Sequence, residues 1–434
     1  MKHKKLFITA ITIFSVVVFL AILIVLWYWG DSYSDFADFN TIKTLSGDSL
    51  DIPGLDDGAV PQGMANYTTT YTFTDDGGIE QTIKQEYLFI SAYMKEGPSR
   101  IYVTGTKTGY VGYVTLKNED GTDYFGHAGG IATSCNNSDS AGNKTQEKNG
   151  TLWIVSDGTV YCTKKSSDEY YNIAEEVIAK AGLTEGDKTI RFTSSFKANN
   201  RASFCFFYED GTVSVLNDKL YVGEFYHPKK DAYSTADDHR VTTLGGDKHN
   251  AFVYEYSSTM DSTNPYGLGL ITTSDVPTEN RVPKIGKIIS VPDKIQGFAI
   301  TKSKKLILSE SYGLANSHLY YYDWSAVTET SSTNRVYYKK LMEDTLGKET
   351  NFTYEGVYYT QRGEQEPVPY TDSSLYVYFA DESKLLRDYS IPSMSEGMCV
   401  NGDRVYVLFE SGCYKYKTFV RQKITTVNYF TPRV

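Results

Sequence analysis

Cysteine is scarce in this sequence, with five residues among 434, at positions 135, 162, 205, 399 and 413. An exported chain that depended on disulfides would usually have more cysteines, and an even number of them. No Cys-x-x-Cys pair and no Cys/His spacing typical of a zinc site occurs. Cys205 and Cys399 recur at equivalent positions of an internal repeat, so we expect small buried residues rather than ligands or nucleophiles.

Long basic runs are also absent, and the formal net charge is −10. This balance indicates that no nucleic acid is bound. Charged residues make up 22% of the chain and the mean hydropathy is −0.37, which excludes a polytopic membrane protein and a disordered chain. Aromatic residues make up 14%, and 37 of them are Tyr, which favours strands over helices.

Recognisable catalytic motifs are missing as well. The sequence around Ser309 and Ser311 is not a Gly-x-Ser-x-Gly nucleophile elbow. The chain has no phosphate loop, dinucleotide fingerprint or zincin motif. The chemistry therefore has to be sought in residues that the fold brings together.

One long apolar run is present, from Leu6 to Trp29, after the lysines of the first five residues. A helix of that length would reach about 36 Å, enough to cross a hydrocarbon core of about 30 Å. The basic start predicts a cytoplasmic N-terminus, with the bulk of the chain outside the cell. The alternative is a cleaved signal peptide, whose apolar core is normally shorter and ends in small residues.

A short pattern recurs five times: a polar or small residue, then Gly (Ser in one copy), a hydrophobic residue, and Ala or Cys. The copies are at 62–65, 129–132, 202–205, 296–299 and 396–399. A second strand pattern follows each copy, at 88–91, 152–155, 220–223, 306–309 and 405–408. A third follows at 100–103, 159–161, 251–254, 318–322 and 413–416, and a fourth leads into the next copy. Four antiparallel strands with small residues innermost are typical of a β-propeller blade.

The repeats predict an all-β fold, a β-propeller of five blades, behind an N-terminal transmembrane helix. The copies start 67, 73, 94 and 100 residues apart. An ordinary blade needs about 40–50 residues, so long insertions are expected. We place these insertions at 228–248, 257–282 and 324–374.

The domain boundaries follow from these segments. Residues 1–30 are the cytoplasmic stub and anchor, 31–48 a linker, and 49–434 the propeller. A degenerate sixth blade, built from 354–358 and 375–378, is the alternative blade count.

Two further elements are expected. Residues 167–183 have an acidic first turn and one apolar face, which predicts a single amphipathic helix on the outside. Residues 49–53 look like 389–392, the segment that precedes the last repeat. We therefore expect an N-terminal strand to complete the final blade and close the ring.

The sequence resembles the bacterial exported β-propellers described as YncE-like, NHL-like or lactonase-like. The matching runs are 60–63, 126–132, 223–227 and 395–398, and the similarity covers most of 49–416. The resemblance implies a propeller fold. Its superfamily includes calcium-dependent lactonases and phosphotriesterases as well as scaffolds, so the fold implies no single activity.

In propellers of this kind, ligands bind at the mouth of the central channel, where the innermost strands begin. The repeat places five polar residues there: Gln62, His127, Arg201, Gln296 and Glu396. The ends of the second strands add Asp157, Glu224, Glu310 and Glu410, and the adjoining loops add His227 and His249. Several polar side chains that converge on one axis are what a ligand site requires.

A calcium site is one hypothesis for this mouth. Gln62, Gln296 and Glu396 occupy the same repeat position and would direct oxygen atoms at one axial ion. The resemblance to calcium-dependent lactonases implies the same metal. The alternative is that these side chains hydrogen-bond neighbouring strands or channel water, since the equivalent Gly129 and Ala202 offer no side-chain oxygen.

Acid–base catalysis is a second hypothesis. His127 beside Glu224 or Glu396 would form a pair that titrates near neutral pH. The alternative is that His127 caps a Gly-rich turn and satisfies backbone groups.

These patterns together predict a propeller held at the cell membrane by residues 6–29 and displayed outside the cell. We expect a binding or scaffold module for a cell-surface glycan, peptide or protein partner. The alternative function is a calcium-dependent hydrolase or lactonase at the channel mouth. The sequence leaves open whether the chain is an enzyme.

Overall fold

The computed structural model describes most of the chain. The described residues are 9, 11–23, 33–74, 77–134, 137–138, 144–145, 150–164, 172–198, 201–212, 214–228, 241–259, 261, 264–271, 281–331, 334–338, 357–359, 365–367 and 375–433. Large parts of the three predicted insertions, at 229–240, 272–280 and 339–356, lie outside these ranges.

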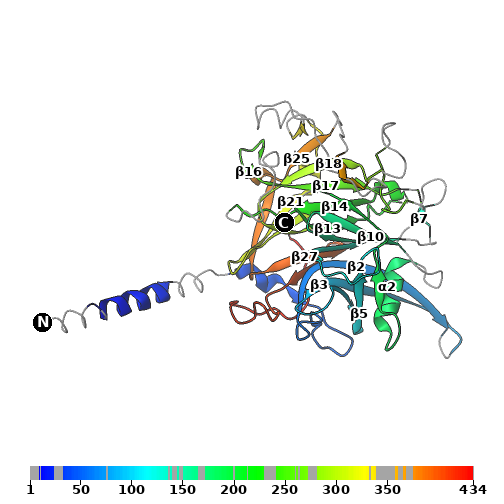
Figure 1. Ribbon diagram of the computed structural model, residues 1–434, viewed down its shortest axis with the longest axis horizontal. Helices are drawn as coiled ribbons and strands as arrows, with labels where there is room; N and C mark the ends of the chain where they lie inside the picture. Colours follow the sequence, from blue (N-terminus) through cyan, green and yellow to red (C-terminus); the bar gives the residue numbers. More distant parts are fainter. Residues whose placement is uncertain are drawn as a thin grey trace.

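Five β-sheets are arranged around a central axis, which confirms the predicted five-bladed propeller (Figure 1). Each blade has four strands that follow one another outward from the axis. The first two blades contain β2 (Ala59–Thr74), β3 (Glu80–Met94), β4 (Arg100–Gly105) and β5 (Gly109–Lys117), then β6 (Gly130–Thr133), β9 (Thr151–Ser156), β10 (Thr159–Lys164) and β12 (Ser194–Lys197). The next two contain β13 (Ala202–Tyr208), β14 (Lys219–Glu224), β17 (Ala251–Ser257) and β18 (Ile285–Val291), then β19 (Ile295–Ile300), β20 (Lys305–Glu310), β21 (Ser317–Asp323) and β26 (Leu385–Ile391). The fifth contains β27 (Ser395–Asn401), β28 (Arg404–Phe409), β29 (Asn428–Phe430) and β1 (Asn40–Thr41).

The inner strands form a closed ring, because each of β2, β6, β13, β19 and β27 contacts the inner strands of both neighbouring blades. Glycines allow this approach. A Cβ atom on Gly397 would lie 2.7 Å from the Cα of Gly63, and one on Gly130 would lie 2.5 Å from the backbone nitrogen of Cys205. Small residues are needed on the innermost strands because the blades converge there and leave no space for a larger side chain.

The N-terminal segment completes the fifth blade at its outer edge. β1 pairs antiparallel with β29, with Asn40 opposite Tyr429. Further along, the carbonyl oxygen of Leu50 accepts a hydrogen bond from the backbone N–H of Val427 at 2.9 Å. This pairing confirms the expected closure by an N-terminal strand, and β1 itself lies within the 31–48 segment that was expected to be a linker.

The alternative of a sixth blade is wrong. β25 (Tyr376–Phe379) pairs in parallel with β18, and β22 (Arg335–Tyr337) pairs with β25, so both strands extend the third blade to six strands. The predicted third strand at 413–416 is also wrong, since these residues form turns and β29 takes that place in the fifth blade.

Smaller elements decorate the blades. The short paired strands are β7 (Asn137–Ser138) with β8 (Lys144–Thr145), β15 (Val241–Thr242) with β16 (Lys248–His249), and β23 (Val357–Tyr359) with β24 (Gln365–Pro367). The short helical elements are η1 (Ser34–Asp38), η2 (Val215–Asn217), α3 (Trp324–Val327) and η6 (Glu382–Lys384).

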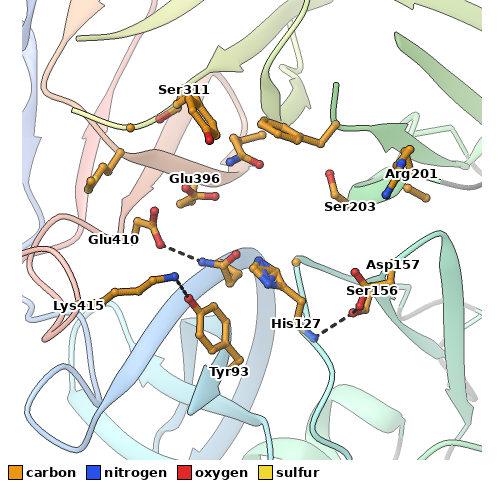
Figure 2. A pocket seen from close by; sticks show the side chains of 18 of the residues that line it. Tyr93, His127, Ser156, Asp157, Arg201, Ser203, Ser311, Glu396, Glu410 and Lys415 are labelled. Carbon is orange, nitrogen blue, oxygen red and sulfur yellow. Dashed lines mark hydrogen bonds between the residues drawn. The ribbon is translucent and has the colours of Figure 1, made fainter. Parts of the chain in front are cut away.

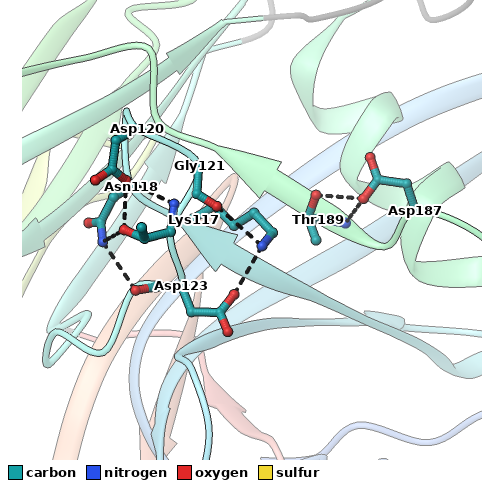
Figure 3. A network of polar contacts seen from close by, with 8 residues as sticks. Lys117, Asn118, Asp120, Gly121, Asp123, Asp187 and Thr189 are labelled. Carbon is teal, nitrogen blue, oxygen red and sulfur yellow. Dashed lines mark hydrogen bonds and ion pairs between the residues drawn. The ribbon is translucent and has the colours of Figure 1, made fainter.

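The predicted amphipathic helix is α2 (Ile173–Gly182), which packs on β5 of the first blade. Asn172 is its N-cap, since its side-chain oxygen accepts a hydrogen bond from the backbone N–H of Glu175. After the helix, β11 (Thr189–Arg191) joins the same blade in parallel with β5. Figure 3 shows the polar contacts at this edge, where Lys117 binds Asp123 at 3.0 Å and Asp187 accepts from Thr189.

Residues 11–23 are helical, and their apolar side chains are exposed. Among the described residues, no helix has both the length and the apolar character needed to cross a membrane. Residues 6–8, 10 and 24–29 of the predicted anchor lie outside the described residues. The membrane anchor stays a prediction.

Closure by the N-terminal segment predicts that Leu50 is important for stability. Leu50 is 2% exposed, so we expect Leu50→Ala to lower the free energy of unfolding by about 2–5 kcal/mol. Leu45 lies in the same segment and is 80% exposed, so Leu45→Ala should change it by less than about 0.5 kcal/mol. Chemical denaturation measures both, and equal effects would contradict the role given to this segment.

Candidate functional site

A cavity of about 540 Å³ opens at the end of the ring where the inner strands begin (Figure 2). All five blades contribute to its wall. The polar and charged side chains that line it are Gln62, His127, Ser156, Asp157, Arg201, Ser203, Gln296, Ser311, Glu396, Glu410 and Lys415. The aromatic ones are Tyr93, Phe225, Tyr312 and Tyr416. The cavity is therefore the channel mouth that the sequence predicts as the ligand site.

The backbone turns sharply just before the inner strands. In four blades a residue with positive φ stands there: Gly58 at 83°, Ala128 at 50°, Lys294 at 59° and Met394 at 67°. Such a conformation is uncommon for residues other than glycine. The carbonyl groups of Lys294 and Met394 accept hydrogen bonds from the backbone N–H groups of Ser311 and Glu410, both at 3.0 Å. The turn thus brings the residue that follows the second strand to the cavity.

A β-bulge lies near the start of four of the inner strands. The pairing register shifts between Pro61 and Gly63, Ala202 and Phe204, Ile295 and Gly297, and Ser395 and Met398. The skipped side chains Gln62, Ser203, Gln296 and Glu396 all line the cavity. A bulge redirects side chains out of the alternating pattern of a strand, and here it directs them to the axis.

Two buried glutamates face each other on the fifth blade. Glu396 is 4% exposed and Glu410 is 9% exposed, and each carboxyl group shifts the pKa of the other. Burial raises the pKa of Glu410 to about 7. The pKa of Glu396 lies well above its ordinary value, because of burial first and then the charge of Glu410. The pair therefore holds a proton at neutral pH, with Glu396 as the donor and Glu410 as the acceptor.

The amide of Gln62 completes this group. Its Nε2 atom donates to Glu410 Oε2 at 3.2 Å and to the carbonyl oxygen of Pro61 at 2.9 Å. Gln62 itself is 5% exposed. The amide orientation is thus set by two acceptors, and the buried carboxylate oxygen gains a partner.

His127 and Lys415 stand at the rim of the cavity. The His127 ring stacks on Tyr93 with centroids 4.8 Å apart, and Lys415 Nζ donates to the Tyr93 hydroxyl at 2.8 Å. Desolvation by the surrounding protein lowers the pKa of His127, Asp157 opposes this, and Lys415 adds to it. His127 is therefore a neutral imidazole at neutral pH.

The opposite wall is formed by the second and third blades. Figure 2 shows Arg201, Ser203 and Asp157 across the cavity from Glu410 and Lys415. The Ser203 hydroxyl oxygen is buried and, within the described part of the chain, has no hydrogen-bond partner. A ligand hydroxyl is the kind of group that would satisfy it.

The structure brings together seven of the eleven residues predicted at the mouth: Gln62, His127, Asp157, Arg201, Gln296, Glu396 and Glu410. The other four lie outside the cavity lining, and of these His249 contacts Ser290 Oγ at 3.1 Å. Glu224 is buried in the third blade and accepts from the Phe252 backbone N–H at 2.9 Å, so it does not pair with His127. Glu310 is paired with Lys294 at 2.6 Å. His227 stacks behind Tyr312, with centroids 4.0 Å apart.

Several lining residues were not among the predicted site residues. Lys415 and Tyr416 had been assigned to a strand, and Ser203 is one residue away from the position that the repeat pattern favoured. Ser311 directly follows the second strand of its blade, the same place that the predicted Glu410 has in the fifth blade. This shared position after the second strand is the sequence signal that could have identified Ser311.

The calcium site stays a prediction. Gln62, Gln296 and Glu396 all line the cavity, and the described residues contain no group of three or more His, Cys, Asp or Glu side chains placed to hold a metal ion. We derive no chemistry through a metal.

Comparisons with known proteins assign no family. No family model and no curated protein matches the chain. Solved structures with weak similarity include the following three. The PQQ-bound aldose sugar dehydrogenase from Streptomyces coelicolor is 12% identical, with 90% of this chain and 97% of that chain covered and a TM-score of 0.35. A mutant Aleuria aurantia lectin in complex with alpha-methyl-L-fucoside is 9% identical (81% and 88% covered, TM-score 0.29), and Saccharomyces cerevisiae Sqt1 is 8% identical (75% and 77%, TM-score 0.23).

The glutamate pair predicts a particular pH dependence of stability. Folding raises the pKa of the Glu410 carboxyl from 4.5 to about 7. The free energy of unfolding is therefore unaffected by this group below pH 4.5, and it falls as the pH rises towards about 7. Glu410→Gln should remove this loss, so the variant should gain stability relative to wild type between pH 4 and pH 8, by on the order of 3 kcal/mol. Denaturant unfolding at several pH values measures it.

The control is Glu96→Gln, which changes the same side chain at an exposed position. The free energy of unfolding of Glu96→Gln should differ from that of wild type by the same amount across this pH range. A Glu410→Gln difference that also stays constant would show that folding does not raise the pKa of Glu410.

Proposed function

We propose that this protein is a binding module and that its axial cavity holds one unit of a glycan, a neutral polyhydroxyl ligand. The observation that carries the proposal is the density of hydrogen-bonding groups in the cavity wall. Beside the charged Asp157, Arg201 and Lys415, the wall contains two amides, the Ser203 hydroxyl and a carboxyl pair that shares a proton, which together offer both donors and acceptors. Sugar hydroxyl groups both donate and accept, so they match such a wall.

Aromatic rings add the second part of the recognition. Tyr93, Tyr312 and Tyr416 line the same cavity as the amides. Their faces provide apolar area for the C–H groups of a sugar ring, while their hydroxyl groups remain polar. The cavity volume of about 540 Å³ falls within the range of about 300–1,000 Å³ that is common for small-ligand sites.

We further propose the setting in which this module works. Residues 6–29 anchor the chain in the cell membrane as a single span, with the N-terminus in the cytoplasm. The propeller then faces the outside, where cell-surface glycans are found. Without its three N-terminal lysines, this part has 40 basic and 53 acidic residues, a formal charge of −13.

Sugar binding is tested with the full chain in a detergent that has no sugar headgroup. A panel of neutral monosaccharides is titrated by calorimetry. Gln296→Ala and Tyr312→Ala should weaken the binding of any sugar that wild type binds. The loss of a hydrogen bond to a buried ligand corresponds to about 1–3 kcal/mol, or roughly 5- to 150-fold in Kd.

The matched control is Tyr110→Ala, which removes an exposed tyrosine outside the cavity and should leave the affinity unchanged. Binding of no sugar in the panel, or equal losses in Tyr110→Ala and Tyr312→Ala, would refute the glycan proposal.

The anchor is tested by fractionation of cells. The full chain should stay with membranes after an alkaline carbonate wash and leave them only with detergent. Deletion of residues 6–29 should release it. External protease should degrade the propeller in intact cells if the proposed orientation holds, and full protection would show that it faces the cytoplasm.

A further inference from the structure

A second depression lies between the first and the fifth blade, away from the axial cavity. Its volume is about 510 Å³. β3 and the turn after β4 form one wall, and β28, β29 and the segment after β1 form the other. The depression therefore sits at the place where the two ends of the chain close the ring.

Four cations and one carboxylate are the charged groups in its lining. The cations are Lys43, Lys84, Lys107 and Arg404, and the carboxylate is Glu86. All four cationic residues are exposed. The chain as a whole has a net charge of −10, so this concentration of positive charge is opposite to the overall balance.

The strands fix this arrangement. Lys84 and Glu86 are two residues apart on β3, so their side chains share one face of the strand. Arg404 and Tyr406 share a face of β28 in the same way. Arg404 also lies over the ring of Tyr429, at 4.4 Å from its centroid, which positions the guanidinium group.

The single carboxylate is already engaged. One oxygen of Glu86 accepts from Asn401 Nδ2 at 2.8 Å, and the other accepts from the Tyr406 hydroxyl at 2.9 Å. In the described part of the chain, Lys43, Lys84 and Lys107 take part in no ion pair, whereas Lys117 and Lys294 elsewhere each bind a carboxylate. The three lysines thus remain available for an external anion.

We propose that this depression is a binding site for a phosphate group. Lysine and arginine are the residues that bind phosphate through charge-assisted hydrogen bonds. The Thr68 hydroxyl lines the same depression and supplies a neutral donor, whereas the hydroxyls of Thr41 and Thr106 already donate to Asn428 Oδ1 and to the carbonyl oxygen of Glu86. An anion held there contacts both blades at the seam of the ring.

The phosphate has two sources, a free phosphorylated molecule or a lipid headgroup. The lipid source rests on the proposed membrane anchor. Thr41 follows residue 29 by 12 positions, so its distance from the end of the anchor is at most about 40 Å. This seam therefore belongs to the part of the propeller that the anchor keeps near the membrane.

The test uses lysine acylation of the full chain, read by mass spectrometry. One arm adds inorganic phosphate in detergent, with chloride at equal ionic strength as reference. The other reconstitutes the chain in phosphatidylcholine vesicles with or without phosphatidylglycerol. We expect the ligand to protect Lys84 and Lys107 from acylation in a saturable way. Their protection should be several-fold greater than that of the exposed Lys302 and Lys423.

Protection by phosphate assigns the site to free phosphorylated ligands, and protection by phosphatidylglycerol alone assigns it to lipid headgroups. The double variant Lys84→Gln/Lys107→Gln should lower the affinity for phosphate at least tenfold in the phosphate arm. In the vesicle arm it should lower the protection of Lys43 from acylation at least tenfold. The charge-matched variant Lys302→Gln/Lys423→Gln should not. Equal effects of the two variants, or no selective protection in either arm, overturn the proposal.

Discussion

The close approach of five strands at one axis is the constraint on which the rest of this structure depends. Where Gly397 meets Gly63 there is no room for a single additional carbon atom. The preceding residues, Gln62 and Glu396, therefore leave the strand pairing as bulges and turn their side chains to the channel mouth. The axial cavity is thus a direct result of how the ring is packed.

The same packing determines the chemistry of the cavity. Glu396 and Glu410 are held where water is largely excluded, so two full negative charges would be costly and one proton is retained. His127 at the rim is neutral for a related reason. The cavity wall is polar without strong charge at its base, whereas the seam between the first and fifth blades is open to solvent and positively charged.

Local patterns were enough to predict the inner and second strands, because alternating apolar residues and innermost glycines are properties of short segments. The side-chain directions were harder to predict. Glu310 is the last residue of β20, whereas Glu410 comes one residue after β28, and a shift of one residue turns a side chain to the other face. Lys415 was missed because its alternating neighbours resemble a strand but form turns. Tertiary contacts decide both cases.

The pairing of β1 with β29 has a consequence for how the protein is made. Asn40 is synthesised long before Tyr429, its partner in the last blade. The outer edge of that blade cannot be completed until almost the whole chain has left the ribosome. Contacts between such distant residues carry a large loop-closure cost and slow the folding reaction. A fixed N-terminus would lower the cost of bringing the two strands together, because β1 would then lie near the place where β29 leaves the ribosome.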